Sequence, residues 1–188
     1  MKMSANNIRP GNVLVYNNRL WVVSKISHTQ PGKGGAYIQT EMKDIQSGTK
    51  LNERFRSSED VERAYLDEKE YQYLYTEGEE LVLMDLDSYE QVHVPIDLVG
   101  EPVAFLQDEM MITVVSYENK PIAVELPEEV VVEVVEADAV VKGQTAASSN
   151  KPAILSNGVR IMVPTFVEAG NRVLVKTADG QYVERAKD

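Results

Sequence analysis

The chain of 188 residues has no cysteine, only two histidines and a single tryptophan. Without cysteine it can form no disulfide, no thiol nucleophile and no cysteine-based zinc site. His28 and His93 leave little for acid–base catalysis or metal binding, and neither a GxSxG nor an HExxH motif occurs. Most enzyme chemistry is therefore disfavoured. We expect a protein that is not an enzyme and that holds no metal or cofactor.

Long apolar runs are also missing. None approaches the roughly 18–20 residues that a membrane-spanning helix needs. Residues 1–7 lead directly into patterned sequence and not into the apolar core of a signal peptide. We therefore expect a soluble, cytoplasmic protein without a membrane partner. We also expect it to act as a monomer.

Charge is distributed unevenly along a chain whose formal net charge is -11. Residues 1–65 hold ten Lys/Arg and six Asp/Glu, residues 66–128 hold two and sixteen, and residues 129–188 hold seven and eight. A basic first third can meet nucleic-acid phosphates, whereas the acidic middle third would be repelled by them. An acidic surface that only aids solubility explains the middle third equally well.

Short stretches of alternating apolar and polar residues, typical of β-strands, recur along the chain. Residues 13–16 and 20–23 predict a hairpin, because Asn17 and Asn18 tolerate the positive φ of a tight turn. Residues 96–107 indicate a short helix. Many short strands with close turns favour barrels or sandwiches, so the sequence predicts an all-β chain. The further strands are predicted at residues 22–28, 36–45, 71–75, 81–84, 111–115, 130–135, 160–163 and 173–176.

Two interruptions suggest domain boundaries. Residues 57–64 are polar and alternate poorly, and residues 126–129 (LPEE) separate two strand-rich blocks. These interruptions predict three small barrels, at 1–65, 66–128 and 129–188. A two-domain arrangement, in which the last two segments form one sandwich, remains open.

The stretch 28–36 (HTQPGKGGA) lies between two predicted strands of the basic segment. Pro31 fixes one backbone angle, and Gly32, Gly34 and Gly35 remove side-chain bulk around Lys33. Such a loop presents one ammonium on a bare tip that could enter a crowded RNA site. An ordinary glycine-rich turn explains the same residues. A nucleotide-binding loop is disfavoured, because glycine follows the lysine where magnesium binding requires Ser or Thr.

Three stretches together resemble the bacterial elongation factor P family over essentially the whole chain: residues 31–34 (PGKG), 84–91 (MDLDSYEQ) and 151–170. The last of these matches the family's C-terminal signature position by position. The resemblance implies three β-barrels in a row, an SH3-like (KOW-like) domain and two OB-fold domains, in an L shape similar to a transfer RNA.

The resemblance also implies a function. Members bind the 70S ribosome between the peptidyl-tRNA and exit sites and promote peptide-bond formation at consecutive prolines. Lys33 would then orient the CCA end of the peptidyl-tRNA, supported by its loop. In relatives with such a lysine, a modifying enzyme commonly adds a β-lysyl group. Gln30 departs from the lysine that often stands there in β-lysylated members.

Two further sites in the last segment follow from the same resemblance. The loop that contains Gly143, Gln144 and Thr145 matches one that approaches messenger RNA in the exit site, and a flexible inter-strand loop is the simpler interpretation. Tyr182 and Arg185 match residues near the anticodon stem of the tRNA. A barrel-edge strand with a solvated charge explains this pair equally well.

Other functions remain open at this point: a paralogue of the factor acting on another stall, or a generic OB/SH3 RNA-binding protein. A generic binder distributes its affinity over many phosphate contacts, so it should be insensitive to the loss of Lys33 alone.

Overall fold

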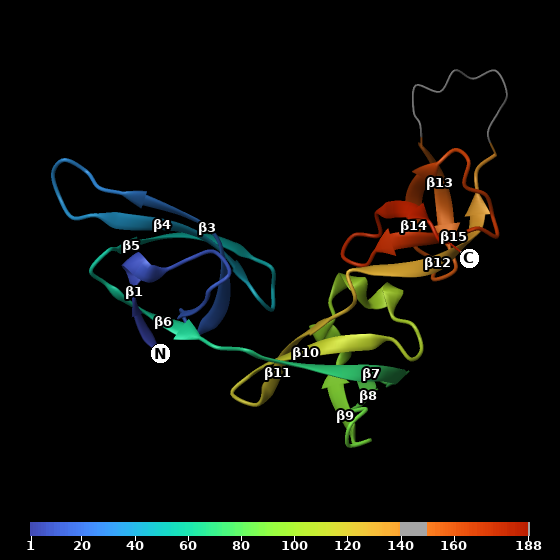
Figure 1. The fold of residues 1–188 in the computed structure, drawn as a ribbon, viewed down its shortest axis with the longest axis horizontal. Coiled ribbons are helices and arrows are strands. Elements are labelled where there is room, and N and C mark those ends of the chain that lie inside the picture. The colour runs from blue at the N-terminus through green and yellow to red at the C-terminus, as the bar shows by residue number, and fades with distance from the viewer. Residues whose placement is uncertain (140–149, 188) are drawn as a thin grey trace. The chain divides into compact units, whose positions relative to one another are not determined.

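The computed structural model describes residues 1–139 and 150–187, and strands dominate it (Figure 1). Within these residues, sixteen strands form three sheets, and three short 3-10 helices join them. The all-β prediction is confirmed. The chain forms two compact units, Met1–Lys69 with Val114–Ala123, and Glu70–Thr113 with Val124–Asp188.

The first sheet has six strands in the order β1-β6-β2-β3-β4-β5. The predicted hairpin is present in it, and Asn17 and Asn18 have φ values of 50° and 60°, as a tight primed turn requires. The strands are β1 (Lys2–Ser4), β2 (Val13–Tyr16), β3 (Arg19–Thr29), β4 (Tyr37–Asp44), β5 (Lys50–Arg56) and β6 (Asp60–Ala64), with the 3-10 helix η1 (Ala5–Asn7) between β1 and β2.

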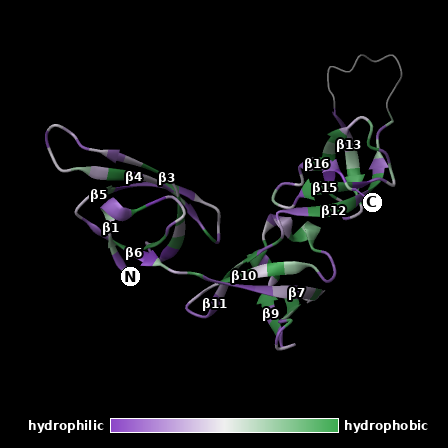
Figure 2. Ribbon diagram, in the orientation of Figure 1, coloured by the Kyte–Doolittle hydropathy of each residue, from purple (hydrophilic) through white to green (hydrophobic). Residues whose placement is uncertain are grey.

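Alternate residues of these strands form one core. Leu14, Ile38 and Met42 are fully or almost fully buried, and each such side chain contributes about 1.5–3 kcal/mol by leaving water. Trp21 belongs to the same core, and its indole N–H donates a hydrogen bond of 2.9 Å to the carbonyl of Tyr16. Hydrophobic and hydrophilic residues alternate accordingly along the strands in Figure 2.

The polar stretch 57–64 contributes a strand despite its poor alternation. Its strand β6 lies between β1 and β2 in the sheet, and Val61 and Ala64 point into the protein interior. Its other side chains are polar, so the pattern of this strand is hard to recognise in the sequence.

The second sheet has the order β11-β10-β7-β8-β9. The short helix expected at 96–107 is instead two 3-10 helices, η2 (Ile96–Leu98) and η3 (Glu101–Phe105). Gly100 lies between them with φ 74° and ψ -149°, which no helix accommodates. The strands are β7 (Asp67–Glu77), β8 (Glu80–Met84), β9 (Gln91–Pro95), β10 (Met111–Tyr117) and β11 (Lys120–Glu125).

The third sheet has the order β14-β13-β12-β15-β16. Its inward-facing side chains are mostly valine, including Val132, Val163 and Val175, which suit a pleated, buried surface. The strands are β12 (Glu129–Ala137), β13 (Asn150–Leu155), β14 (Arg160–Pro164), β15 (Arg172–Lys176) and β16 (Tyr182–Arg185).

The helix η3 belongs to the core of the third sheet. The ring of Phe105 is 5% exposed and packs among the valines of that core. Two side-chain hydrogen bonds hold the same segment. Asn157 Nδ2 donates to the carbonyl of Ala104 at 3.0 Å, and Gln107 Nε2 donates to the carbonyl of Val131 at 2.8 Å.

Candidate RNA-binding sites

The loop of Lys33 joins β3 to β4 at the far end of the longest hairpin of the first unit (Figure 1). The last paired residues before the loop are Thr29 and Tyr37. Pro31 is half-buried, and Lys33 is exposed between exposed glycines. Among the described residues, Lys33 has no hydrogen-bond or ion-pair partner. Its ammonium is therefore available to an external group.

The glycines of this loop are not required by close packing inside the protein. A Cβ atom placed at Gly32, Gly34 or Gly35 would meet no atom within 4 Å. Only Gly34 has a conformational reason for lacking a side chain, because its φ is +103°. Glycine at positions 32 and 35 leaves the outside of the loop bare.

The opposite end of β4 is anchored by a buried carboxylate. Asp44 is 5% exposed, and its Oδ1 accepts hydrogen bonds from the backbone N–H groups of Gln46 and Ser47 at 2.8 and 3.1 Å. Its Oδ2 lies 3.3 Å from Nη1 of Arg19. Burial alone would raise the pKa of Asp44, but the two backbone hydrogen bonds and the charge of Arg19 together lower it.

A second group with a shifted pKa, the Tyr16 hydroxyl, belongs to the same barrel. The pKa of the Tyr16 hydroxyl is raised by its hydrogen bond to Glu53 and by partial desolvation. The Tyr16 ring also packs edge-on against Phe55, with 5.8 Å between ring centroids. Tyr16 therefore serves the structure of the barrel and stays protonated at neutral pH.

The predicted messenger-RNA contacts Gly143, Gln144 and Thr145 lie outside the described residues. Tyr182 and Arg185 both lie on β16, but the structure does not bring their side chains together. The register of β15 and β16 shifts between Leu174 and Val175, and Arg185 lies opposite Val173 whereas Tyr182 lies opposite Val175. Tyr182 is half-buried against the core of the third sheet, whereas Arg185 is exposed.

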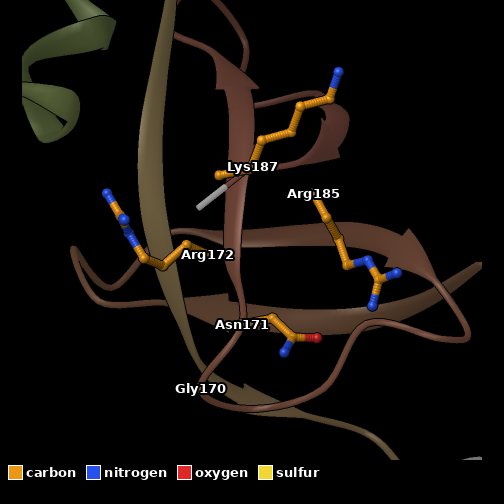
Figure 3. Close-up of a pocket in the computed structure, with 6 residues that line it drawn as sticks. Gly170, Asn171, Arg172, Arg185 and Lys187 are labelled. Carbon is orange, nitrogen blue, oxygen red and sulfur yellow. The ribbon is translucent and has the colours of Figure 1, made fainter.

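Arg185 lies at the edge of an open, positively charged groove. Its guanidinium carbon is 4.9 Å from the centroid of the exposed Phe166 ring, a distance typical of a cation–π contact. The groove has a volume of about 410 Å³ and is also lined by Asn171, Arg172 and Lys187. Figure 3 shows that the cationic side chains spread apart and do not converge on one point. Such a surface suits an extended polyanion better than a single small ion.

The sequence interpretation missed Arg172 and Lys187. Lys187 follows Arg185 by two residues, so the period of a strand could have indicated it. Arg172 comes from β15, and only the pairing of Val173 with Arg185 brings it to this surface. That pairing cannot be read from the sequence.

Neither a metal site nor a membrane span is found in the described part of the chain. Residues 1–139 and 150–187 contain no cluster of three or more His, Asp or Glu side chains that could hold a metal ion. None of their helices has the length and apolar character needed to cross a membrane.

Family models for elongation factor P match this chain in three consecutive segments: its KOW-like domain over residues 4–61, its OB domain over 66–124 and its C-terminal domain over 130–185. The chain belongs to the elongation factor P family. Elongation factor P of Zymomonas mobilis subsp. mobilis is 58% identical over 186 residues, covering 99% of this chain and 100% of that protein. The factor of Rickettsia canadensis is 54% identical over 188 residues, covering both chains fully.

Solved structures show the same fold at lower identity. The eukaryotic translation initiation factor 5A from Methanococcus jannaschii aligns with a TM-score of 0.57 at 20% identity, over 68% of this chain and 94% of that one. The resemblance inferred from the three sequence stretches is thus confirmed. As a member of the elongation factor P family, the chain belongs to a class of translation factors with a KOW-like domain followed by an OB domain.

Proposed function

We propose that this protein binds the 70S ribosome between the peptidyl-tRNA and exit sites and accelerates peptide-bond formation at consecutive prolines. The observation that carries this proposal is the exposed Lys33, which has no partner in the described part of the chain and lies on a bare loop of a member of the elongation factor P family. Proline restricts its own backbone, so it reacts slowly unless the reacting groups are well placed.

Lys33 acts by position and not by proton transfer. A lysine on a flexible four-carbon stem is a mobile point charge, which can hold the backbone of the CCA end of the peptidyl-tRNA. Restricting the motion of that end before the reaction lowers the entropy cost of aligning the reacting groups. Such alignment can raise a reaction rate by orders of magnitude. The protein is in this proposal an accessory factor and not an enzyme. It acts as a cytoplasmic monomer.

A covalent extension of Lys33 is a further part of the proposal. The tip has room for one, because no atom of the described residues lies within 4 Å of a Cβ placed at Gly32 or Gly35. A β-lysyl group, added by a lysine-modifying enzyme, would lengthen the reach and add positive charge. The mass of the intact protein purified from its native host, compared with Lys33→Ala from the same host, tests for an adduct at this residue.

The last domain supplies the secondary contacts. Arg185, together with Arg172 and Lys187, offers a cationic surface to the phosphates of the peptidyl-tRNA, and Tyr182 offers a partly exposed ring. Gly143, Gln144 and Thr145 stay predicted contacts to messenger RNA in the exit site.

A purified translation system that lacks this factor tests the function directly. Native-source protein is added, and peptide-bond formation is timed on a message with three consecutive prolines and on a matched message without them. We expect acceleration on the proline message only. Lys33→Ala should fold normally. At saturating concentration it should give a rate of peptide-bond formation on the proline message about 10- to 100-fold lower than that with the native protein. Lys50→Ala removes another exposed lysine of the same barrel and should keep full activity.

A fully active, folded Lys33→Ala protein would refute the role of the loop. If neither protein accelerates the proline message, the ribosomal proposal fails. A paralogue that acts on another stall, or a generic OB/SH3 RNA-binding protein, would then be the better description.

A further inference from the structure

The ring of Phe166 lies outside the core of the third sheet and has no role in the contacts described so far. Phe166 belongs to the loop between β14 and β15, and it is 56% exposed. The next residue, Val167, is fully buried and takes the inward position of this loop. Single exposed apolar side chains are common on protein surfaces, so the surroundings of the ring decide what it can do.

The loop that carries Phe166 is held firmly against the sheet. The N–H of Gly170 donates to the carbonyl of Val134 at 2.7 Å, and the N–H of Val134 donates to the carbonyl of Asn171 at 2.8 Å. Asn171 Oδ1 also accepts a hydrogen bond from the N–H of Glu168 at 2.9 Å. A ring on an anchored loop loses little further motion when a flat ligand stacks on it.

Arg185 of β16 reaches the same ring. Its guanidinium carbon lies 4.9 Å from the centroid of Phe166. A guanidinium in such a contact keeps its charge and its N–H donors. It occupies one face of the ring, and the opposite face is left to an external group. The exposed fraction of Phe166, measured with Arg185 in place, agrees with a ring that is covered on one side only.

The groove beside this pair is positively charged. Arg172, Arg185 and Lys187 line it and point in different directions (Figure 3). Glu133 lies opposite Arg172 across β12 and β15. Within residues 1–139 and 150–187, however, none of the three cations has an ion-pair partner. Negative charge at this surface must therefore come from a ligand, and separated cations suit successive phosphates of one chain.

We propose that Phe166 and the three cations form a stacking site for an unpaired nucleotide of RNA. The base lies on the free face of the Phe166 ring, and the flanking phosphates contact Arg172, Arg185 and Lys187. Aromatic rings beside a positive groove hold single strands in this way. A base within a duplex is covered by its neighbours, so the site selects unpaired RNA. The inference rests on the proposed function, because the ribosome and its transfer and messenger RNA supply such nucleotides.

Binding of the intact protein to 70S ribosomes with a tRNA in the peptidyl site tests the site over a series of salt concentrations. Phe166→Ala should weaken binding about 5-fold or more, as expected for the loss of one stacked base. The slope of log K against log salt should stay unchanged, because a ring contact releases no counterions. Arg185→Ala should lower that slope by about one. If Phe166→Ala lowers the slope equally, the ring only holds Arg185 and the stacking site is overturned.

Two further substitutions separate stacking from simple apolar burial. Phe166→Tyr keeps the ring and should bind like the wild type. Phe166→Leu keeps apolar area without an aromatic face, and it should lose nearly as much affinity as Phe166→Ala. Full binding by Phe166→Leu would overturn the stacking role.

Met162→Ala is the matched control. Met162 is an apolar residue of the same barrel with a similar exposure of 51%, but it does not line the groove. Its loss should change binding by roughly 2-fold at most. Equal losses from Met162→Ala and Phe166→Ala would overturn the inference. Hydrogen exchange of β12 and β15 establishes that each variant keeps the fold of this barrel.

Photo-crosslinking identifies what the ring touches. A benzoylphenylalanine in place of Phe166 keeps an aromatic side chain at this position and reacts with neighbouring groups on irradiation. In the ribosome complex we expect a crosslink to an unpaired nucleotide, and its identity distinguishes transfer, messenger and ribosomal RNA as the source. Crosslinks only to base-paired nucleotides, only to protein, or to nothing would overturn the site.

The same proteins separate this inference from the proposed function. Wild-type protein that binds ribosomes but fails to accelerate the proline message sinks the function, and the binding data then decide the stacking site by themselves. If wild-type protein does accelerate it, Lys33→Ala should lower the rate at saturation. Phe166→Ala should instead raise the concentration needed for half-maximal acceleration, and an unchanged half-maximal concentration would sink the stacking site alone.

Discussion

Lys33 lies in the loop before β4 and Asp44 is the last residue of that strand, and their charges have opposite environments. Asp44 is buried, and two backbone N–H groups and Arg19 compensate its charge. Lys33 is exposed and has no partner among the described residues. A compensated buried charge fixes a turn, whereas an uncompensated exposed one is available for binding. The two residues therefore call for different measurements, of stability for Asp44 and of activity for Lys33.

Asp44→Ala should lower the free energy of unfolding at pH 7 by about 1–3 kcal/mol, because it leaves the part-buried N–H groups of Gln46 and Ser47 without their acceptor. Asp44→Asn keeps an acceptor oxygen and should cost less. Trp21 pairs with Asp44 across β3 and β4, so urea unfolding followed by its fluorescence reports on this region. Equal stability of wild-type and Asp44→Ala protein would contradict the assigned role.

Acid should remove the contribution of the Asp44 charge. Its pKa is lower in the folded protein than in the unfolded chain, where a carboxyl of this kind titrates near about 3.9. The stabilisation is therefore fully present above the unfolded value and is lost as the pH falls through the folded one. The stability of wild-type protein should begin to fall toward that of Asp44→Asn as the pH drops below about 3.9, and the two should converge only below the lowered pKa of the folded state. A difference that stays constant down to pH 2 would contradict the lowered pKa.

At the scale of the element, the strands with regular alternation could be predicted from the sequence. The hairpin of β2 and β3 and the strands β8 and β15 lie where the pattern placed them. β5 could not be recognised, because Glu53 occupies a half-buried position between Leu51 and Phe55 and breaks the alternation. The Glu53 side chain has a polar partner at this position, because it is hydrogen-bonded to the Tyr16 hydroxyl.

The candidate sites also differ in whether they can be predicted from local sequence. The Lys33 loop is local in sequence, so composition alone indicates it. Arg172 gains its neighbour Arg185 through strand pairing. Strand register depends on the whole sheet and cannot be derived from one segment.

Gly180 is the element-scale feature most open to test. It has a φ of +75°, and a Cβ atom there would lie 3.3 Å from Cζ of Phe105 and 3.4 Å from Cγ2 of Ile161. Gly180→Ala should therefore destabilise the second unit by about 2–3 kcal/mol, since backbone strain and overpacking add. Gly170→Ala is the control, because its φ is also positive but no atom lies within 4 Å.

Hydrogen exchange of β12 and β15 measures this effect, because the only tryptophan belongs to the other unit. Gly170→Ala should show the smaller increase in exchange. If both variants exchange alike, the contact of Gly180 with Phe105 contributes nothing beyond backbone strain.

At the scale of the whole molecule, two compact units imply two separable stabilities. Asp44 belongs to the first unit and Gly180 to the second. Substitutions without shared neighbours usually act independently. Asp44→Ala should therefore shift the transition seen by Trp21 and leave exchange of β12 and β15 unchanged, and Gly180→Ala should do the reverse. A shift of both transitions by either variant would show that the units unfold together.

Charge is arranged on the same scale. Residues 1–65 are basic, and residues 66–128 hold sixteen acidic residues against two basic ones. The overall negative charge opposes binding to RNA, so affinity depends on where the cations lie. In this protein they lie beside the Lys33 loop and along β15 and β16.

The burial of Phe105 also has a consequence for folding while the chain is being synthesised. Phe105 precedes every strand of the sheet whose core it completes, and the last of the surrounding core strands, β15, ends at Lys176. At synthesis rates of about 5–20 residues per second, several seconds pass before that partner exists. During this interval the apolar ring of Phe105 stays exposed, because the core of the third sheet that buries it has not yet formed. A pause in translation between the second and third sheets would prolong its exposure to chaperones and to other nascent chains.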